Sequence, residues 1–358
     1  MSRTPKWIVP LAIFAVAETL SALKLISPYY ITVLCYICID GILVLSLNLT
    51  NGYLGETNLG HSAFAGVGAY VAVTLLTMGL RIGSTSPLLA QELGFLVALL
   101  AGGLAAGLTG LALSVPAFNT RGDYFALVTF GFNMIVINVV NNIDAVGGAR
   151  GYQGVPPDRL IPKVTNLAWS MALLVLAVLV CRNFVSSGYG RDVLSIREDE
   201  VAAELMGVNT RRAKALCIAI SAFLAGIAGA LYVHLIQYTH PSMFSSVKSI
   251  ELLAMLYLGG VGRLGGAILG AAVINISLEG MRQVLPVFNL SPIWRMVIVP
   301  GMLAMLMLTR PSGLLGGIRE LSLFAVPDSV SRTDFTTTGL ASWLHLRRSR
   351  QATKSKET

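Results

Sequence analysis

Long runs of apolar residues separated by short polar segments follow one another along the whole chain. A helix of about 20 mostly apolar residues crosses the hydrocarbon core of a bilayer, and ten stretches approach or reach that length. These stretches are residues 7–26, 28–49, 61–80, 94–116, 124–142, 166–185, 214–236, 249–261, 265–285 and 293–309. The pattern predicts an all-α integral membrane protein with about ten transmembrane helices, some of them short or broken.

The eighth stretch, residues 249–261, is too short to cross a bilayer alone and runs into a glycine cluster. Such an interrupted segment is typical of the half-helices found near transporter binding sites. Leu59–Gly66 is faintly similar to Leu264–Gly270, which suggests an internal repeat. Small residues at helix contacts produce the same pattern without a repeat, so the sequence leaves both interpretations open.

The composition excludes a water-soluble protein. Of the 358 residues, 54% are hydrophobic and 12% are charged, whereas soluble domains carry about 25% charged residues. The net charge of +8 is not gathered on a soluble basic module, so nucleic-acid binding is not expected. Cys35 and Cys38 form a C-x-x-C pair inside an apolar stretch, so we interpret them as packing residues and expect no metal site.

The distribution of Lys and Arg predicts the orientation, because cytoplasmic loops retain positive charge. With the N-terminus inside, 18 of the 26 basic residues lie on the cytoplasmic side and 8 outside. Ten spans then place both termini in the cytoplasm. We expect a transmembrane domain over residues 1–317 and a basic, flexible cytoplasmic tail over residues 318–358.

The longest predicted cytoplasmic loop, Ser186–Arg212, has the signals of a compact helix. Ser195 as N-cap and Glu198 three residues later form a capping box. Gly207 suits the position just after the helix, where a left-handed backbone is common. We therefore predict one helix over Ile196–Met206.

An apolar stripe at helical spacing follows one side of this predicted helix, formed by Val201, Ala202, Leu205 and Met206. A short amphipathic helix on the cytoplasmic side needs a surface that buries its stripe. That surface is either the protein's own transmembrane bundle or a docked soluble subunit. Periodicity alone leaves both alternatives open.

Polar groups within the spans are few, and they are the candidates for a solute pathway. His61 follows a glycine at the start of the third stretch, and a helix broken by glycine frees backbone donors for a polar solute. Thr129 and Asn133 share one face of the fifth stretch, although buried amides also join helices to each other. The complete candidate set is Asn58, Gly60, His61, Ser62, Thr129, Asn133, Gly259 and Gly260.

Asp40 lies near the middle of the second stretch. An ionisable group inside a span is a functional-site hypothesis by default, and a protonated carboxyl beside a polar neighbour is the structural alternative. The sequence does not decide between them. Glu279 and Arg282 are expected to pair with each other near the outer end of the ninth stretch.

Several segments resemble the permease family of branched-chain amino acid ABC importers, of the LivM-like type. The matching loop segment is Ile196–Asn209, in which Arg197–Asn209 is the most specific part, and the similarity extends over about residues 30–317. Other matching segments, in order, are Leu47–Leu49, Leu59–Phe64, Gly68–Tyr70, Arg121–Thr129, Gly190–Arg191, Lys214, Ser221–Gly226, Gly259–Gly262 and Arg310–Leu314. Glu56 and Asn58 depart from the family, which usually has Gln and Ser there, and the family is normally uncharged at Asp40.

The resemblance implies a permease subunit in the bacterial inner membrane that takes up branched-chain or other neutral amino acids. It implies a second permease subunit, two ATP-binding subunits and a periplasmic solute-binding protein as partners. It also favours docking of the loop helix to an ATPase subunit. The implied coupling residues are Arg197, Glu198, Asp199, Glu200, Val201, Ala202, Leu205, Met206 and Gly207.

ATP is expected on the partner subunits, with no cofactor in this chain, because no Gly-Lys dipeptide exists to form a Walker A phosphate loop. Carriage of urea or another small polar solute is one alternative function. An ion-coupled secondary transporter is another, although the acidic residues of the spans are scattered rather than aligned. No paired catalytic set indicates an enzyme.

Overall fold

The computed structural model describes residues 27–77, 87–117, 123–153, 163–284 and 301, and this part of the chain is almost entirely helical. The main helices are α2 (Pro28–Asn48), α3 (His61–Thr77), α4 (Pro87–Ala117), α5 (Asp123–Asn141), α6 (Lys163–Ser186), α7 (Gly188–Glu198), α8 (Glu200–Leu205), α9 (Thr210–Ile236), α10 (Ser246–Gly259) and α11 (Leu264–Val284). Eight predicted stretches coincide with helices, while 7–26, 293–309 and the tail 318–358 lie outside the described residues.

Six of the described helices are long and apolar enough to cross a membrane. The α3 helix, with 17 residues, and α10, with 14, are shorter. The α4 helix begins at Pro87, seven residues before the predicted start, because proline is well suited to the first turn of a helix. The described part of the chain therefore combines long spans with shorter helices.

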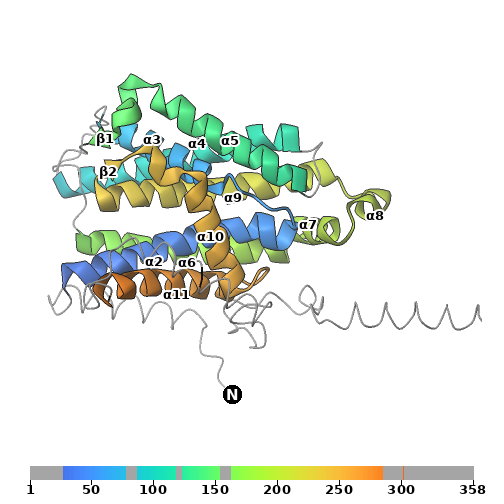
Figure 1. Ribbon diagram of the computed structural model, residues 1–358. Coiled ribbons are helices and arrows are strands. Elements are labelled where there is room, and N and C mark those ends of the chain that lie inside the picture. Colours follow the sequence, from blue (N-terminus) through green and yellow to red (C-terminus); the bar gives the residue numbers. More distant parts are fainter. Residues whose placement is uncertain (1–26, 78–86, 118–122, 154–162, 285–300, 302–358) are drawn as a thin grey trace, which may run out of the picture. The chain divides into compact units, whose positions relative to one another are not determined.

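The helices form two groups that surround a shared core (Figure 1). The α9 helix packs against α3 and α4, while α2 packs against α6 and α11, and a contact between α2 and α9 joins the groups. Within their apolar segments, 67% of α2 and 72% of α9 are buried, compared with 22% of α5. The α2 and α9 helices are therefore central, and α5 is peripheral.

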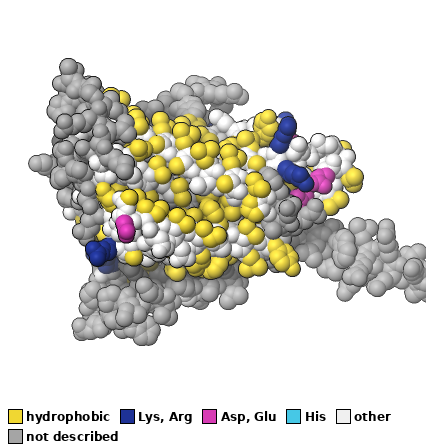
Figure 2. Space-filling model, turned by 90° about the horizontal axis from the view of Figure 1, so that it is seen from above, with side chains coloured by type: hydrophobic (Ala, Val, Ile, Leu, Met, Phe, Trp, Pro, Cys, Tyr) yellow, Lys and Arg dark blue, Asp and Glu magenta, His cyan; other side chains and the backbone are white. Residues whose placement is uncertain are grey.

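The peripheral helices present apolar side chains outward. Leu104 and Leu108 on α4 and Leu127 on α5 are more than half exposed. Figure 2 shows such side chains covering the middle of one face, with charged groups near its two ends. This distribution suits an apolar belt in contact with lipid and charged ends in contact with water.

Two helix interruptions meet inside the bundle. The α2 helix continues as a π-helix, η1 (Leu49–Leu54), and the chain then turns before α3 begins. The α10 helix ends at Gly259 and is followed by a glycine turn before α11. Asn48 joins the two turns, since its amide donates to the Arg263 carbonyl at 3.1 Å and accepts from the Gly262 N–H at 2.9 Å.

The structure therefore contains the predicted half-helix at α10. Small residues also bring the helices together, because a Cβ at Gly229 of α9 would lie 1.9 Å from the carbonyl oxygen of Ala65 in α3. The internal repeat stays a prediction.

At the opposite end of the bundle from α8, the chain forms short elements (Figure 1). They are the 3₁₀-helices η2 (Asp144–Val146) and η3 (Gly148–Arg150) and the strands β1 (Tyr152–Gln153) and β2 (Tyr238–Thr239), which pair antiparallel. A further 3₁₀-helix, η5 (Pro241–Phe244), follows β2 and leads into α10.

Candidate functional site

The loop between α6 and α9 contains two helices, α7 and α8, and the prediction of one helix with a capping box was wrong. Ser195 lies inside α7, where its hydroxyl donates to the Asp192 carbonyl at 2.7 Å. Asp199 adopts an extended backbone and caps α8, since its carboxylate accepts from the N–H groups of Val201 at 2.9 Å and Ala202 at 3.0 Å. An acidic N-cap satisfies free amides and complements the helix dipole, so the break occurs at Asp199.

The predicted end of this segment is confirmed. Gly207 follows α8 with φ of +88°, in the left-handed region. Its N–H donates to the Glu204 carbonyl, and the Val208 N–H donates to the Ala203 carbonyl. This pair of bonds is the Schellman arrangement, which satisfies the last carbonyls of a helix.

The apolar stripe on α8 is not buried against the other residues that the structure describes. Leu205 is 84% exposed, Met206 is 86% exposed and Val201 is 51% exposed, whereas Ala203 on the opposite side is buried. Ala202 is also exposed. In Figure 1, α8 lies beyond the end of the helix bundle. Burial against the protein's own transmembrane bundle, one of the two alternatives for this stripe, is therefore not seen among the described residues.

Arg197 faces inward, unlike the stripe. Its Nη1 donates to the carbonyl of Gly52 in η1 at 2.5 Å. The side chain lies against Gly55, where a Cβ would be 2.8 Å from Arg197 Cγ. Burial lowers the pKa of the Arg197 guanidinium. Arg197 therefore anchors α7 to the interruption after α2.

A second anchor is an ion cluster of Glu56, Glu200 and Lys214, here called the loop triad. Lys214 Nζ lies 2.6 Å from a carboxylate oxygen of Glu56 and 2.9 Å from one of Glu200. The Lys214 side chain is 2% exposed, so the cluster is enclosed by protein. Burial raises the pKa of Glu56, and the contact with Lys214 opposes that shift. The triad connects the turn before α3, the start of α8 and the start of α9.

Sequence analysis did not identify Lys214 as a site residue. Two signals were available: Lys214 lies next to an apolar run, and Glu56 departs from the family pattern. No local pattern connects these two residues, because they are 158 positions apart. Glu198 is exposed, as a docking residue would be. Of the nine predicted coupling residues, Arg197 and Glu200 are instead tied to the bundle.

Two predicted pathway residues, Ser62 and Asn133, are brought together. The Asn133 side-chain amide donates to the Ser62 hydroxyl at 2.9 Å and to the Phe244 carbonyl at 3.1 Å. Two serines at the start of α10 complete the group. Ser249 accepts from the Ser62 N–H at 3.0 Å, and Ser246 donates to Asn133 at 3.0 Å.

A small cavity adjoins this polar group. Its walls include Leu43 of α2, Ser62 of α3, Tyr232 of α9, Phe244 of η5, and Lys248 and Leu252 of α10. Most of the lining is apolar, and Ser62, Tyr232 and Lys248 are the lining residues with polar side chains.

The other predicted pathway residues lie in separate contacts. Asn58 accepts from the Gly60 N–H at 2.9 Å, and Thr129 accepts from the Leu59 N–H at 3.0 Å. His61 Nε2 lies 2.8 Å from the Ser46 hydroxyl. Gly259 and Gly260 lie at the turn into α11, where a Cβ at Gly259 would be 1.9 Å from the Gly266 carbonyl oxygen. The structure thus places the candidate pathway residues in several separate contacts and not around one cavity.

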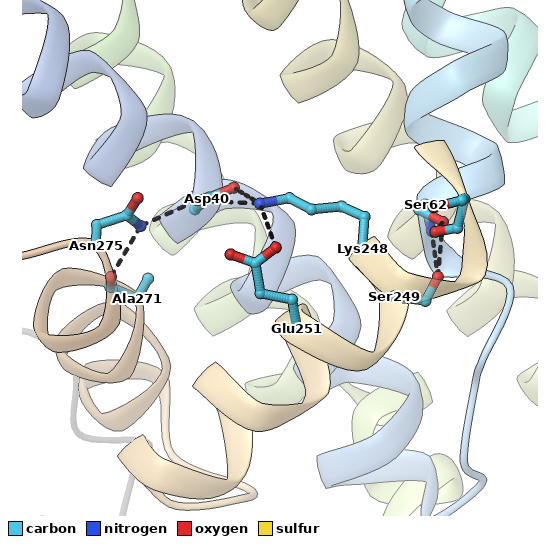
Figure 3. A network of polar contacts seen from close by, with 8 residues as sticks. Asp40, Ser62, Lys248, Ser249, Glu251, Ala271 and Asn275 are labelled. Carbon is cyan, nitrogen blue, oxygen red and sulfur yellow. Dashed lines mark hydrogen bonds and ion pairs between the residues drawn. The ribbon is translucent and has the colours of Figure 1, made fainter. Parts of the chain in front are cut away.

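Asp40 belongs to a second ion cluster, here called the core cluster, with Lys248, Glu251 and Asn275 (Figure 3). Lys248 Nζ is 3.1 Å from Asp40 Oδ1 and 3.5 Å from Glu251 Oε2. The Asn275 amide donates to Asp40 Oδ2 at 3.0 Å. Asp40 is therefore ion-paired, which the sequence analysis did not consider.

Lys248 directly precedes the predicted stretch 249–261, whereas the structure includes it in α10, which packs against α2 and α11. The signal that could have found it is a lysine and a glutamate three residues apart at the start of a half-helix. The expected pair of Glu279 and Arg282 is confirmed at 3.5 Å, and the Tyr29 hydroxyl also donates to Glu279.

Comparison with known proteins gives one consistent family. The model of the family described as "Branched-chain amino acid transport system / permease component" matches residues 29–308. The chain is 31% identical to the LivM permease protein of the high-affinity branched-chain amino acid transport system of Escherichia coli, over 76% of this chain and 67% of the relative. It is 24% identical to the guanosine ABC transporter permease protein NupQ of Bacillus subtilis, over 71% of this chain and 83% of the relative. No solved structure matches the chain.

Proposed function

This chain belongs to the family of permease components of branched-chain amino acid transport systems, and we propose that it forms the translocation pathway of a bacterial ABC importer for branched-chain or other neutral amino acids. Family membership makes it a membrane transport component rather than an enzyme. The observation that carries the coupling role is the exposed stripe of α8, because large apolar side chains on a water-facing loop mark an interaction surface.

The working complex that we propose contains a second permease subunit, two ATP-binding subunits and a periplasmic solute-binding protein. The chain crosses the inner membrane about ten times, with both termini in the cytoplasm and a permease domain over residues 1–317. Residues 318–358 form a basic cytoplasmic tail. The charge distribution supports this orientation, and the two interruptions joined by Asn48 are compatible with an internal repeat.

Docking of α8 is proposed to bury Val201, Leu205 and Met206 in a cleft of an ATPase subunit. Full burial of such a side chain contributes roughly 1.5 to 3 kcal/mol. Movement of α8 would reach the bundle through Glu200 in the loop triad and through Arg197 on Gly52. Both anchors end on the segment between α2 and α3, which precedes Ser62 at the cavity. The contacts therefore form a continuous physical connection from the docking surface to the proposed pathway.

The solute pathway is proposed to pass beside Ser62 and Asn133, while Asn58, Gly60, His61 and Thr129 hold the broken helix in shape. Gly259 and Gly260 allow α10 to end as a half-helix beside α11. The cavity next to Ser62 supports this division of roles, because it combines apolar walls with a few polar groups.

Replacement of Leu205 by Asp tests the docking role. Because Leu205 is 84% exposed, the variant permease should insert with wild-type yield and stability. It should fail to co-purify with the ATPase, because an unpaired carboxylate in an apolar contact is strongly unfavourable. A matched control is Tyr189→Asp, since Tyr189 is exposed on α7 outside the stripe. Wild-type co-purification of Leu205→Asp with solute-stimulated ATP hydrolysis would refute the role.

The orientation has its own test. Single cysteines at Ser187 and Ser355 should be shielded from an impermeant thiol reagent in intact cells. Labelling of either cysteine from outside would contradict the proposed topology.

A further inference from the structure

The core cluster has an unusual charge balance for a group of residues among apolar helices. Two carboxylates, Asp40 and Glu251, share one ammonium, that of Lys248. Asp40 is 4% exposed. Charged groups at such positions are costly, and an apolar set of similar volume would be equally stable or more so. A buried ion cluster is therefore weak evidence for stability, and the core cluster is a candidate for a role in function.

The two ion pairs of Lys248 differ. The pair with Asp40 is short, with 3.1 Å between Lys248 Nζ and Asp40 Oδ1; the Asp40 side chain is 5% exposed and also accepts a hydrogen bond from Asn275. The pair with Glu251 is longer, with 3.5 Å between Lys248 Nζ and Glu251 Oε2, and the Glu251 side chain is 36% exposed. Asp40 and Glu251 approach the Lys248 ammonium from two different helices, α2 and α10 (Figure 3). Asp40 can therefore keep Lys248 in position while Glu251 separates from it.

Lys248 also lines the cavity beside Ser62. The rest of that lining includes the apolar side chains of Leu43, Phe244 and Leu252. A small molecule with one charged end and one aliphatic end matches the chemical character of these residues. A neutral amino acid has both, whereas a nucleoside has no charged group that the ion pair would recognise.

We propose that Lys248 and Glu251 form a transient site for the zwitterionic head group of a neutral amino acid on its way across the membrane. The solute carboxylate binds the Lys248 ammonium, and the solute ammonium binds the carboxylate of Glu251. The zwitterion thus enters an existing ion pair and leaves no buried charge uncompensated. The aliphatic side chain contacts the apolar wall of the cavity, and Asp40 with Asn275 positions Lys248.

This inference rests on the proposed function, so its test separates transport from energy coupling. The complete complex is placed in proteoliposomes with leucine-loaded binding protein. Leucine flux, stimulated ATP hydrolysis and thermal unfolding of the detergent-purified complex are measured. If leucine-loaded binding protein does not stimulate ATP hydrolysis by the wild-type complex, the proposed function is rejected, whatever the variants show.

The decisive variant is Glu251→Gln, which leaves a neutral pair of Asp40 and Lys248 and so preserves the fold. We expect leucine flux to fall about tenfold, as for loss of one partner of a buried charge contact. Stimulated ATP hydrolysis should stay within about twofold of wild type, because docking and coupling are distant from Glu251. Glu251→Asp, which keeps the carboxylate, should restore most of the flux.

Glu279→Gln is the matched control. Glu279 also pairs with a basic residue three positions away at 3.5 Å, but its partner Arg282, unlike Lys248, does not line the cavity. Its flux should equal that of wild type. Wild-type flux in Glu251→Gln would overturn the proposal, and so would an equal loss in both variants.

If Glu251→Gln does not assemble, Lys248→Arg decides the question, because it keeps the ion pair. The larger, planar guanidinium presents a different geometry to a carboxylate. We then expect flux about fivefold lower at unchanged stability. Unchanged flux in Lys248→Arg would show that the cluster only joins helices and would overturn the proposal.

Discussion

The loop triad and the core cluster have the same charges, one lysine between two carboxylates, and different geometry. In the loop triad the contacts of Lys214 measure 2.6 and 2.9 Å, and its side chain is 2% exposed. In the core cluster the contacts of Lys248 measure 3.1 and 3.5 Å, and its side chain is 21% exposed. The first cluster is enclosed where three segments meet, and the second borders a cavity.

This difference separates a structural connection from an exchangeable site. A short, enclosed ion pair has no room for another ligand, and removal of one partner leaves a buried charge without compensation. A longer contact beside a cavity can open and accept a solute group. The tight cluster is therefore suited to transmit a movement of α8, and the loose one is suited to bind and release.

Removal of the lysine from each cluster should have the largest effect and the clearest contrast. Lys214→Met removes the ammonium from the Glu56 carboxylate in an enclosed site, which should destabilise the permease by about 3 to 5 kcal/mol. Lys248→Met should cost less, because Glu251 is partly exposed and Asn275 still binds Asp40. Thermal unfolding of the two purified proteins measures the difference, and equal losses would remove the distinction between the clusters.

Neutralisation of Glu200 should affect coupling rather than folding. Glu200→Gln leaves the short pair of Glu56 and Lys214 in place and weakens only the connection to α8. We expect the ATPase to co-purify normally while transported leucine per ATP hydrolysed falls several-fold. Glu198→Gln is the matched control, because Glu198 is exposed in the same loop. A normal ratio of leucine to ATP in Glu200→Gln would exclude the triad as the connection.

Substitution of Gly207 should have a smaller effect, and it tests whether the position of α8 determines ATPase binding. A Cβ at Gly207 meets nothing within 4 Å, so the cost of Gly207→Val comes from its φ of +88° alone. That cost is about 1 to 2 kcal/mol, and it should weaken ATPase binding about tenfold through a misplaced α8. Gly207→Asn, which tolerates this backbone better, should bind nearly as wild type. Titration of the purified permease with the ATPase measures both, and equal affinities for Val and wild type would contradict the expectation.

Removal of the Asn275 amide should have the smallest effect. Asn275→Ala takes one hydrogen bond from Asp40 while Lys248 remains, which should cost about 0.5 to 1.5 kcal/mol. Leucine flux should decrease only slightly, because the Lys248–Glu251 pair is intact. A larger loss than in Lys248→Met would contradict the view that Lys248 is the main partner of Asp40.

Local rules explain which features could be predicted. Eight stretches match helices, because a chain in lipid must satisfy its backbone groups within each helix and long apolar runs leave no other solution. The end of α8 at Gly207 was predicted for a similar reason, since its bonds lie within one turn. The start of α8 was not predicted, because Ser195 and Asp199 both suit an N-cap.

The candidate site was only partly predicted, because its contacts join distant segments. Ser62 and Asn133 were expected on separate helices, and only packing shows that they touch. Glu56 and Lys214 are 158 residues apart, and Asp40 and Lys248 are 208 apart. No periodicity connects such positions, so a charge near an apolar run has no visible partner in the sequence.

The sequence by itself determined the membrane class of this protein, the places of its helices and the apolar stripe of α8, because these depend on hydrophobicity and on hydrogen bonds between near neighbours. The tertiary structure alone decided that the stripe is left exposed, that Lys214 is shared by two acids and that Lys248 reaches Asp40 beside a cavity. Those outcomes depend on which helices pack together. Ion pairs in a low-dielectric interior form wherever packing brings opposite charges together, at any distance along the chain.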